Sequence, residues 1–122
     1  MTSGVGTIIF PVTDLAAAKA VFTELLGVDP AAEFPYYVGF DAPGQHVGLD
    51  PNGHKQGMTG PTMYWHVDDI ESAVAGLLRA GATEQSAAKD VGGGRLIATV
   101  TDADGNVIGL LQDRPAGATR GE

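Results

Sequence analysis

The chain of 122 residues has no cysteine, which excludes disulfides, a thiolate nucleophile and Cys-ligated zinc or iron-sulfur sites. Basic residues are few: seven Lys and Arg against fifteen Asp and Glu give a formal net charge of −8. Such a chain has few positive side chains to neutralise the phosphates of a nucleic acid, so we expect no nucleic-acid partner. The start, MTSGVG, lacks a basic region and a long apolar stretch, and no window approaches the ~20 apolar residues that span a bilayer. We therefore expect a cytoplasmic location and no membrane partner.

Apolar residues make up 43% and charged residues 18% of the chain, a composition that can bury a core. The 18 glycines exceed the usual share of about 7% and stand at breaks between patterned segments. This spacing indicates many short elements joined by tight turns. We expect one domain over residues 1–113 and a flexible tail over residues 114–122, which are small, polar and without periodicity.

The first half of the chain reads as a strand, a helix and two further strands. Residues 7–12 (TIIFPV) are rich in β-branched and aromatic side chains. Asp14 can cap a helix that Gly27 ends in a left-handed conformation, and short strands are expected over 36–40 and 46–50. The predicted helix carries apolar residues at helical spacing: Leu15, Ala18, Val21, Phe22, Leu25 and Leu26.

The second half repeats this order. A strand over 62–67 (TMYWHV) precedes a helix that Asp68 or Asp69 caps and Gly81 ends. Strands over 95–101 and 106–111 follow, joined by a hairpin turn at Asp104-Gly105. The two halves also match residue by residue, because Thr7 and Thr62, Val12 and Val67, and Asp14 and Asp69 are separated by the same number of residues. We interpret the chain as two related modules.

Four motifs resemble the vicinal oxygen chelate superfamily, which includes glyoxalase I, extradiol dioxygenases and bleomycin-resistance proteins. They are VTDL at residues 12–15, LLG at 25–27, VDDI at 67–70 and DADGN at 102–106. The resemblance covers residues 7–112. It implies an α+β fold in which paired βαβββ modules, about 5–56 and 60–113, form a cup-shaped mixed sheet with the helices outside. It also implies a homodimer.

Enzymes of this superfamily hold a divalent metal ion with His and Glu side chains at equivalent strand positions. In this chain the two histidine positions fall on Thr7 and Thr62, and the two carboxylate positions fall on Gly48 and Gly109. A threonine hydroxyl is a weak neutral ligand, and glycine offers no side chain. We therefore expect no metal ion and no cofactor.

The three histidines are His46, His54 and His66, and no pair has a spacing that indicates chelation. His66 shares a strand face with Thr62 and Tyr64, because side chains alternate along a strand. A relocated metal site, or an acid-base residue such as His66 or Tyr64, remains the alternative. In that case the protein is a lyase, isomerase or dioxygenase of the same superfamily.

A cup without a metal ion must recognise its ligand by shape, stacking and hydrogen bonds. Aromatic residues suited to flat ligands occur at 34, 36, 37 and 40 and as the pair Tyr64-Trp65, although alternation sends part of this set, including Trp65, to the core. The acidic charge favours cationic ligands. We predict a metal-free small-molecule-binding protein that sequesters a planar or cationic compound. The predicted ligand-binding residues are Thr7, Ile9, Thr62, Tyr64 and His66.

Overall fold

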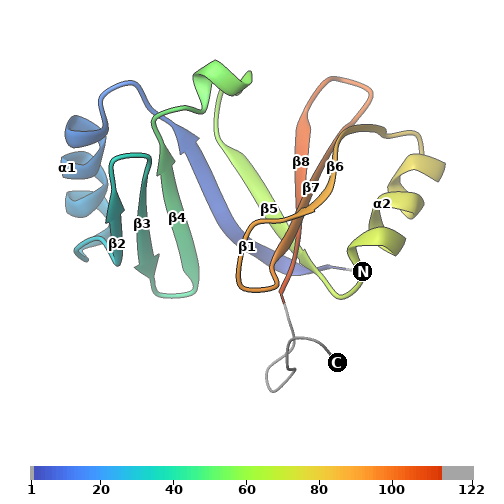
Figure 1. Ribbon diagram of the computed structural model, residues 1–122, viewed down its shortest axis with the longest axis horizontal. Coiled ribbons are helices and arrows are strands. Elements are labelled where there is room, and N and C mark those ends of the chain that lie inside the picture. Colours follow the sequence, from blue (N-terminus) through green and yellow to red (C-terminus); the bar gives the residue numbers. More distant parts are fainter. Residues whose placement is uncertain (1, 114–122) are drawn as a thin grey trace. The chain divides into compact units, whose positions relative to one another are not determined.

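The computed structural model describes residues 2–113, so the tail predicted over 114–122 lies outside the described residues. The described residues form eight strands, two α-helices and one short 3-10 helix, and Figure 1 shows the path of the chain through them. The elements are β1 (Thr2–Pro11), α1 (Leu15–Leu26), β2 (Ala32–Phe34), β3 (Tyr37–Ala42), β4 (Gln45–Asp50), η1 (His54–Gln56), β5 (Thr62–Val67), α2 (Ile70–Arg79), β6 (Thr83–Asp90), β7 (Leu96–Thr101) and β8 (Val107–Gln112).

The described chain divides into two compact units with the same order of strands and α-helix. The first unit covers residues 6–63, and the second covers residues 64–113 together with residues 2–5. In the first, the strand order is β2-β3-β4-β1, with β1 parallel to β4 and the other neighbours antiparallel. In the second, the order is β5-β8-β7-β6, with β5 parallel to β8. Both units thus hold a mixed sheet and one helix, and the predicted α+β class is confirmed.

Helix α1 packs on one face of the first sheet. The Asp14 side chain accepts a hydrogen bond from the Ala17 backbone N–H at 3.0 Å, and Gly27 ends the helix with a φ of 72°. The core beneath α1 consists of alternate residues of β3 and β4, namely Val38, Phe40, Val47 and Leu49, which are buried. Phe10 and Phe22 are partly buried and pack against this core.

The apolar pattern of α1 is wider than its packed face. Val21 and Leu25 were grouped with the other apolar helix positions, yet they are 62% and 71% exposed. The apolar residues of α1 that pack against the core of the first sheet are Leu15, Ala18, Phe22 and Leu26. Helical spacing alone does not separate the two groups, because all six positions fall within about half of the helix circumference.

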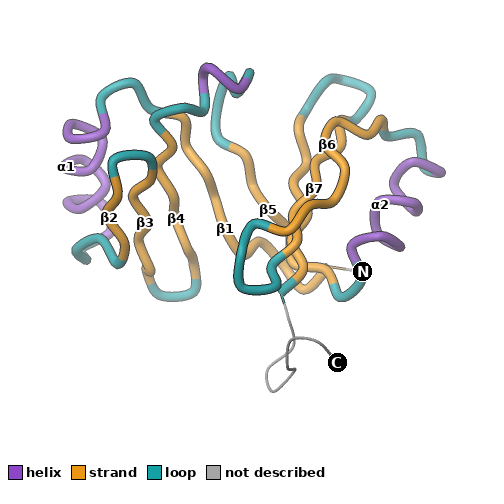
Figure 2. Tube along the Cα trace, viewed as in Figure 1, coloured by secondary structure: helices purple, strands orange, loops and turns teal. Residues whose placement is uncertain are grey.

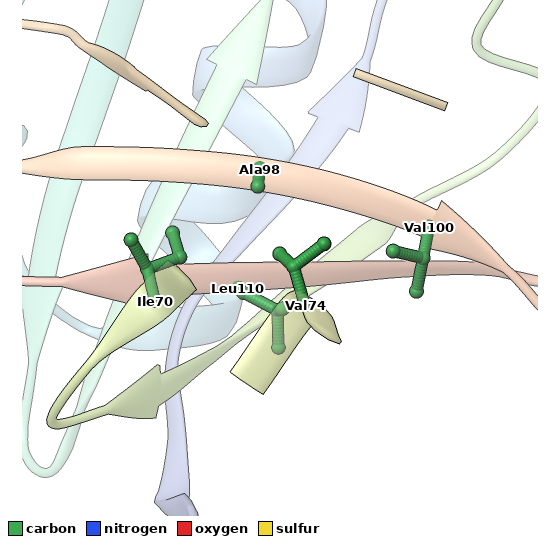
Figure 3. Packing of buried hydrophobic residues seen from close by; sticks show 5 residues of the cluster. All are labelled: Ile70, Val74, Ala98, Val100 and Leu110. Atoms are coloured by element: carbon green, nitrogen blue, oxygen red, sulfur yellow. The ribbon is translucent and has the colours of Figure 1, made fainter. Parts of the chain in front are cut away.

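Helix α2 covers one face of the second sheet. Asp69, rather than Asp68, is the N-cap, since its carboxylate accepts from the Ser72 backbone N–H at 3.2 Å. Trp65 packs against this core, as predicted. Figure 3 shows the residues that fill the space between helix and sheet: Ile70, Val74, Ala98, Val100 and Leu110.

The sequence analysis did not predict strands β2 and β6, which lie at sheet edges (Figure 2). Strand β2 has three residues, and β6 has the sequence TEQSAAKD with mostly exposed side chains. Strand β2 is too short for a pattern to be recognised, and β6 lacks the alternation of apolar and polar residues on which strand prediction rests. Among the described residues, neither α-helix has the length and apolar character needed to cross a membrane.

Candidate functional site

The first sheet has one face against α1 and a second face, which we call the distal face. Because side chains alternate along a strand, the burial of Val38 and Phe40 beneath α1 places their neighbours Tyr37, Gly39 and Asp41 on the distal face. Strand register then aligns Asp41 with His46 on β4. The distal face is therefore polar at this end of the β3-β4 hairpin.

A chain of two hydrogen bonds joins three distal-face side chains, which we call the Tyr37–His46–Asp41 cluster. His46 Nδ1 lies 2.8 Å from Asp41 Oδ1, and His46 Nε2 lies 2.9 Å from Tyr37 Oη. The ionised carboxylate can only accept, so in a neutral imidazole the proton sits on Nδ1. Nε2 then accepts the hydrogen bond that the Tyr37 hydroxyl donates.

Two glycines form the surface on which Tyr37 lies. A Cβ at position 39 would stand 3.0 Å from Tyr37 Cε2, and a Cβ at position 48 would stand 2.7 Å from Tyr37 Cε1. The same Cβ at position 48 would also collide with Tyr37 Oη and lie 2.7 Å from Ile9 Cδ1. Neither glycine has a positive φ. Their small size, and not backbone conformation, is what the Tyr37 ring needs.

The residues that the family resemblance assigns to chelating positions do not fit a metal ion. Strand register pairs Gly48 with Ile9 and Gly109 with Tyr64, each two positions after the threonine of its unit. The two glycines are therefore equivalent, and the Tyr37 side chain takes the space that a ligand side chain at 48 would require. Residues 2–113 also hold no cluster of three or more His, Asp or Glu that could bind a metal ion.

The second unit serves as an internal comparison for the Tyr37–His46–Asp41 cluster. Thr99 pairs with Gly109 as Gly39 pairs with Gly48, which aligns the two hairpins residue by residue. At the positions equivalent to Tyr37, Asp41 and His46, the second unit has Ile97, Thr101 and Val107. The same antiparallel hairpin thus forms with apolar and neutral residues. The fold does not require the polar cluster.

The five predicted ligand-binding residues are divided between the two units. Thr7 and Ile9 lie on β1 directly opposite His46 and Gly48, so they share the distal face with the cluster. Thr62, on β5, is buried. Tyr64 and His66 belong to the second unit, where register aligns them with Gly109 and Leu111.

His66 stands beside an ion pair of the second unit. Its Nδ1 lies 3.6 Å from Asp113 Oδ2, while Arg95 Nε donates to Asp113 Oδ1 at 2.6 Å. All three side chains are more than a third exposed, so this cluster is a solvated one whose net energetic contribution is small.

Sequence reasoning missed Tyr37 and Asp41. The available signal was the pair Asp41 and His46 on either side of a Pro-Gly turn, with four residues between them. A hairpin would bring these two residues opposite each other, and alternation would add Tyr37 to the same face. Treating Tyr37 only as one member of an aromatic group concealed this relation.

A second candidate is an apolar groove of about 560 Å³ beside α2 in the second unit. Its lining includes the apolar residues Trp65, Val67, Leu77 and Ile108 and the hydroxyl-bearing residues Thr2 and Ser72. Ligand sites combine an apolar lining with a few convergent polar groups. The groove has the apolar lining of such a site, but its lining residues include no hydrogen-bonded cluster of acidic and basic groups like the one on the distal face.

The chain also matches a known protein family. Residues 4–110 match the family model described as Glyoxalase/Bleomycin resistance protein/Dioxygenase superfamily. No curated protein matches the chain.

Several solved structures share the fold at low sequence identity. A member of the same superfamily from Vibrio splendidus is 20% identical over 88% of this chain and 97% of its own, with a TM-score of 0.62. The methylmalonyl-CoA epimerase of Mycobacterium tuberculosis is 18% identical over 93% and 90%, with a TM-score of 0.66. A hypothetical protein from Bacillus halodurans is 12% identical over 94% and 97%, with a TM-score of 0.73. At these identities the likeness establishes the fold alone.

Proposed function

Because the chain belongs to the Glyoxalase/Bleomycin resistance protein/Dioxygenase superfamily, we propose that it binds a small flat organic molecule without a metal ion. The observation that supports this proposal is the position of Tyr37, whose ring and hydroxyl take the space of a side chain at 48. An aromatic ring with a polar edge stands where relatives would place a metal-binding carboxylate. Recognition by stacking and hydrogen bonding replaces chelation.

The proposed binding surface is the distal face of the first sheet. Tyr37 and His46 supply polar groups, and Ile9 supplies an apolar wall beside Gly48. From the set predicted on sequence grounds, Thr7 and Ile9 belong to this face, and Thr62, Tyr64 and His66 stay predicted ligand contacts. The net charge of −8 raises the local concentration of cations and disfavours anions. A planar neutral or cationic compound is the ligand class we propose, with sequestration as its outcome.

Calorimetric titration of chelator-treated protein against a panel of flat aromatic probes tests this function. We expect binding that persists in the presence of the chelator. Tyr37→Ala should weaken it by about 1 kcal/mol or more, as expected for loss of an aromatic contact. Tyr36→Ala is the matched control, because Tyr36 is 61% exposed and stacks on Phe34 instead. Stoichiometric metal held by side chains of this chain after purification would contradict the proposal.

A second candidate function is a lyase, isomerase or dioxygenase of the same superfamily that uses a relocated metal site or an acid-base residue. The observation that favours the acid-base form is the hydrogen-bonded Tyr37–His46–Asp41 cluster. Its order of hydroxyl, imidazole and carboxylate is the arrangement that general acid-base catalysis uses to move a proton. Turnover of a bound probe would favour this candidate, and release of the probe unchanged would favour sequestration.

We also propose a homodimer located in the cytoplasm. Light scattering on a sizing column tests the assembly, with about twice the 12.5 kDa chain mass expected. Cell fractionation tests the location. A monomer at micromolar concentration would refute the assembly without affecting the binding proposal.

A further inference from the structure

We infer that the Tyr37–His46–Asp41 cluster is a proton relay that deprotonates a bound ligand carrying an acidic O–H group, such as a phenol or an enol. The inference rests on the proposed function, because it concerns the ligand of the same distal face. It adds the chemical class of that ligand and the chemical step that accompanies its binding.

The hydrogen bonds of the cluster have a defined direction. Asp41 Oδ1 accepts from His46 Nδ1 over 2.8 Å, which leaves Nε2 as the acceptor of the Tyr37 hydroxyl over 2.9 Å. A ligand hydroxyl that meets Tyr37 Oη meets an oxygen whose own proton already points toward a base. The geometry is that of an activated hydroxyl, with the carboxylate orienting the imidazole.

The proton transfer balances without a co-reactant. The ligand O–H bond breaks, and its proton forms a new O–H bond on Tyr37. The original O–H bond of Tyr37 breaks at the same time, and that proton forms an N–H bond on His46 Nε2. The products are a ligand anion and an imidazolium, which remains paired with the Asp41 carboxylate. No electrons are gained or lost, and dissociation reverses each transfer.

Structural need does not account for the cluster. The side chain of Asp41 is 73% exposed and that of His46 is 30% exposed, so both can hydrogen-bond to water and neither must find a protein partner. The equivalent hairpin of the second unit forms with Thr101 and Val107 opposite each other. Three polar groups in hydrogen-bond order are thus a local addition to the first unit.

The surroundings favour a neutral acid over an anion. On the neighbouring strand β1, the residues opposite the cluster are the uncharged Thr7 and Ile9. On β2, Ala32 and Phe34 pair with Gly39 and Tyr37 and are also uncharged. Asp41 is therefore the charged group next to the imidazole, and the chain as a whole carries a net charge of −8. Anions in solution are repelled, so the ligand arrives protonated. Its ionisation comes from transfer of the proton to His46 and not from the charge of the surroundings.

The pair of probes 4-nitrophenol and 4-nitroanisole tests the relay directly. Both are flat and similar in size, but only 4-nitrophenol has an ionisable O–H, and its anion absorbs visible light whereas its neutral form does not. At a pH where free 4-nitrophenol is mostly neutral, we expect the bound probe to show the absorption of the anion. We also expect about tenfold tighter binding than for 4-nitroanisole, as one hydrogen bond to a charged group typically gives.

Three variants separate the relay from simple packing. His46→Gln and Asp41→Asn should each reduce the anion absorption and weaken 4-nitrophenol binding about tenfold relative to 4-nitroanisole binding. Tyr37→Phe keeps the ring on its two glycines but removes the hydroxyl, and it should abolish the preference between the probes. His54→Gln is the matched control, because His54 is an exposed residue of η1 in the same unit. Circular dichroism confirms that each variant is folded.

The possible outcomes distinguish the relay from the proposed function. Equal affinity for the two probes, with 4-nitrophenol bound in its neutral form, overturns the relay and leaves metal-free binding intact. Failure of 4-nitrophenol to bind, while other flat probes bind and Tyr37→Ala weakens them, also overturns the relay alone. Failure of every flat probe to bind overturns both. Anion absorption that survives in His46→Gln and Asp41→Asn likewise overturns the relay.

Discussion

The side chain of Tyr37 occupies the space that any side chain at Gly48 would need, with its ring carbon Cε1 only 2.7 Å from the position of a Cβ there. One glycine therefore has two consequences. It offers no side chain at a position where the resemblance to the superfamily implies a metal-binding carboxylate, and it makes room for a phenol whose hydroxyl reaches His46. The missing side chain at Gly48 and the hydrogen-bonded Tyr37 therefore belong to one local arrangement.

Substitution Gly48→Ala tests this close packing. The new methyl group meets both Tyr37 and Ile9 at distances too short for contact, so one of them must move. Overpacking of this kind costs about 1–3 kcal/mol, which urea unfolding should register. Gly60→Ala is the control, because nothing lies within 4 Å of a Cβ there and its φ is not positive. Equal stability of the two variants would show that Tyr37 leaves its place freely.

The core of the first unit allows a comparison of two phenylalanines. Phe40 is completely buried beneath α1, whereas Phe34 on β2 is 48% exposed. Phe40→Ala should lower the free energy of unfolding by about 3–5 kcal/mol, the usual cost of a large cavity. Phe34→Ala should cost much less, because the side chain is half in water already. Chemical denaturation measures both, and similar losses would contradict the assignment of the core.

Much of the fold can be predicted from the sequence because single capping residues agree with the apolar pattern of the segment that lies between them. Asp14 and Gly27 mark both ends of α1, and the helix lies between them. Strand β5 over Thr62–Val67 has the predicted bounds. Edge strand β6 gave no such signal, since its side chains are mostly exposed and pattern prediction depends on burial.

The candidate site was harder to predict than the fold. Assigning Gly48 and Gly109 to equivalent positions required only the repeat, and strand register supports it. The Tyr37–His46–Asp41 cluster depends instead on which residues of β3 and β4 face each other. A shift of one residue in the hairpin would send Asp41 to the opposite face from His46. Composition and spacing do not determine that register.

The N-terminus of α2 offers a test of two adjacent aspartates. Asp69 accepts from the Ser72 backbone N–H at 3.2 Å and also from the Ser72 hydroxyl at 3.1 Å. Asp69→Ala should therefore destabilise the protein by about 1 kcal/mol, the usual cost of losing an N-cap. Asp68→Ala removes the same charge next to the cap without removing a capping bond, so its midpoint in urea should change less. The reverse order would make Asp68 the cap.

The turn between β7 and β8 predicts a dependence on pH. Hydrogen bonds from the Asn106 side chain and backbone, both 2.9 Å long, together with those from Asp104 and Gly105, lower the pKa of Asp102 from its ordinary value of 3.8. A carboxyl with a lowered folded-state pKa stabilises the protein above its unfolded pKa, and this contribution is lost as the pH falls through the folded value.

Removing the largest of these contacts should shift that titration. Asn106→Ala deletes the side-chain hydrogen bond, so the pKa of Asp102 should rise toward 3.8. Part of the stability of the turn should then be lost at a higher pH than in the original protein. A carbon NMR titration of the Asp102 carboxyl measures the shift, and Asn52→Ala, in the turn after β4, is the control that should leave Asp102 unchanged. An unaltered Asp102 titration in Asn106→Ala would mean that the backbone N–H groups alone hold the carboxylate.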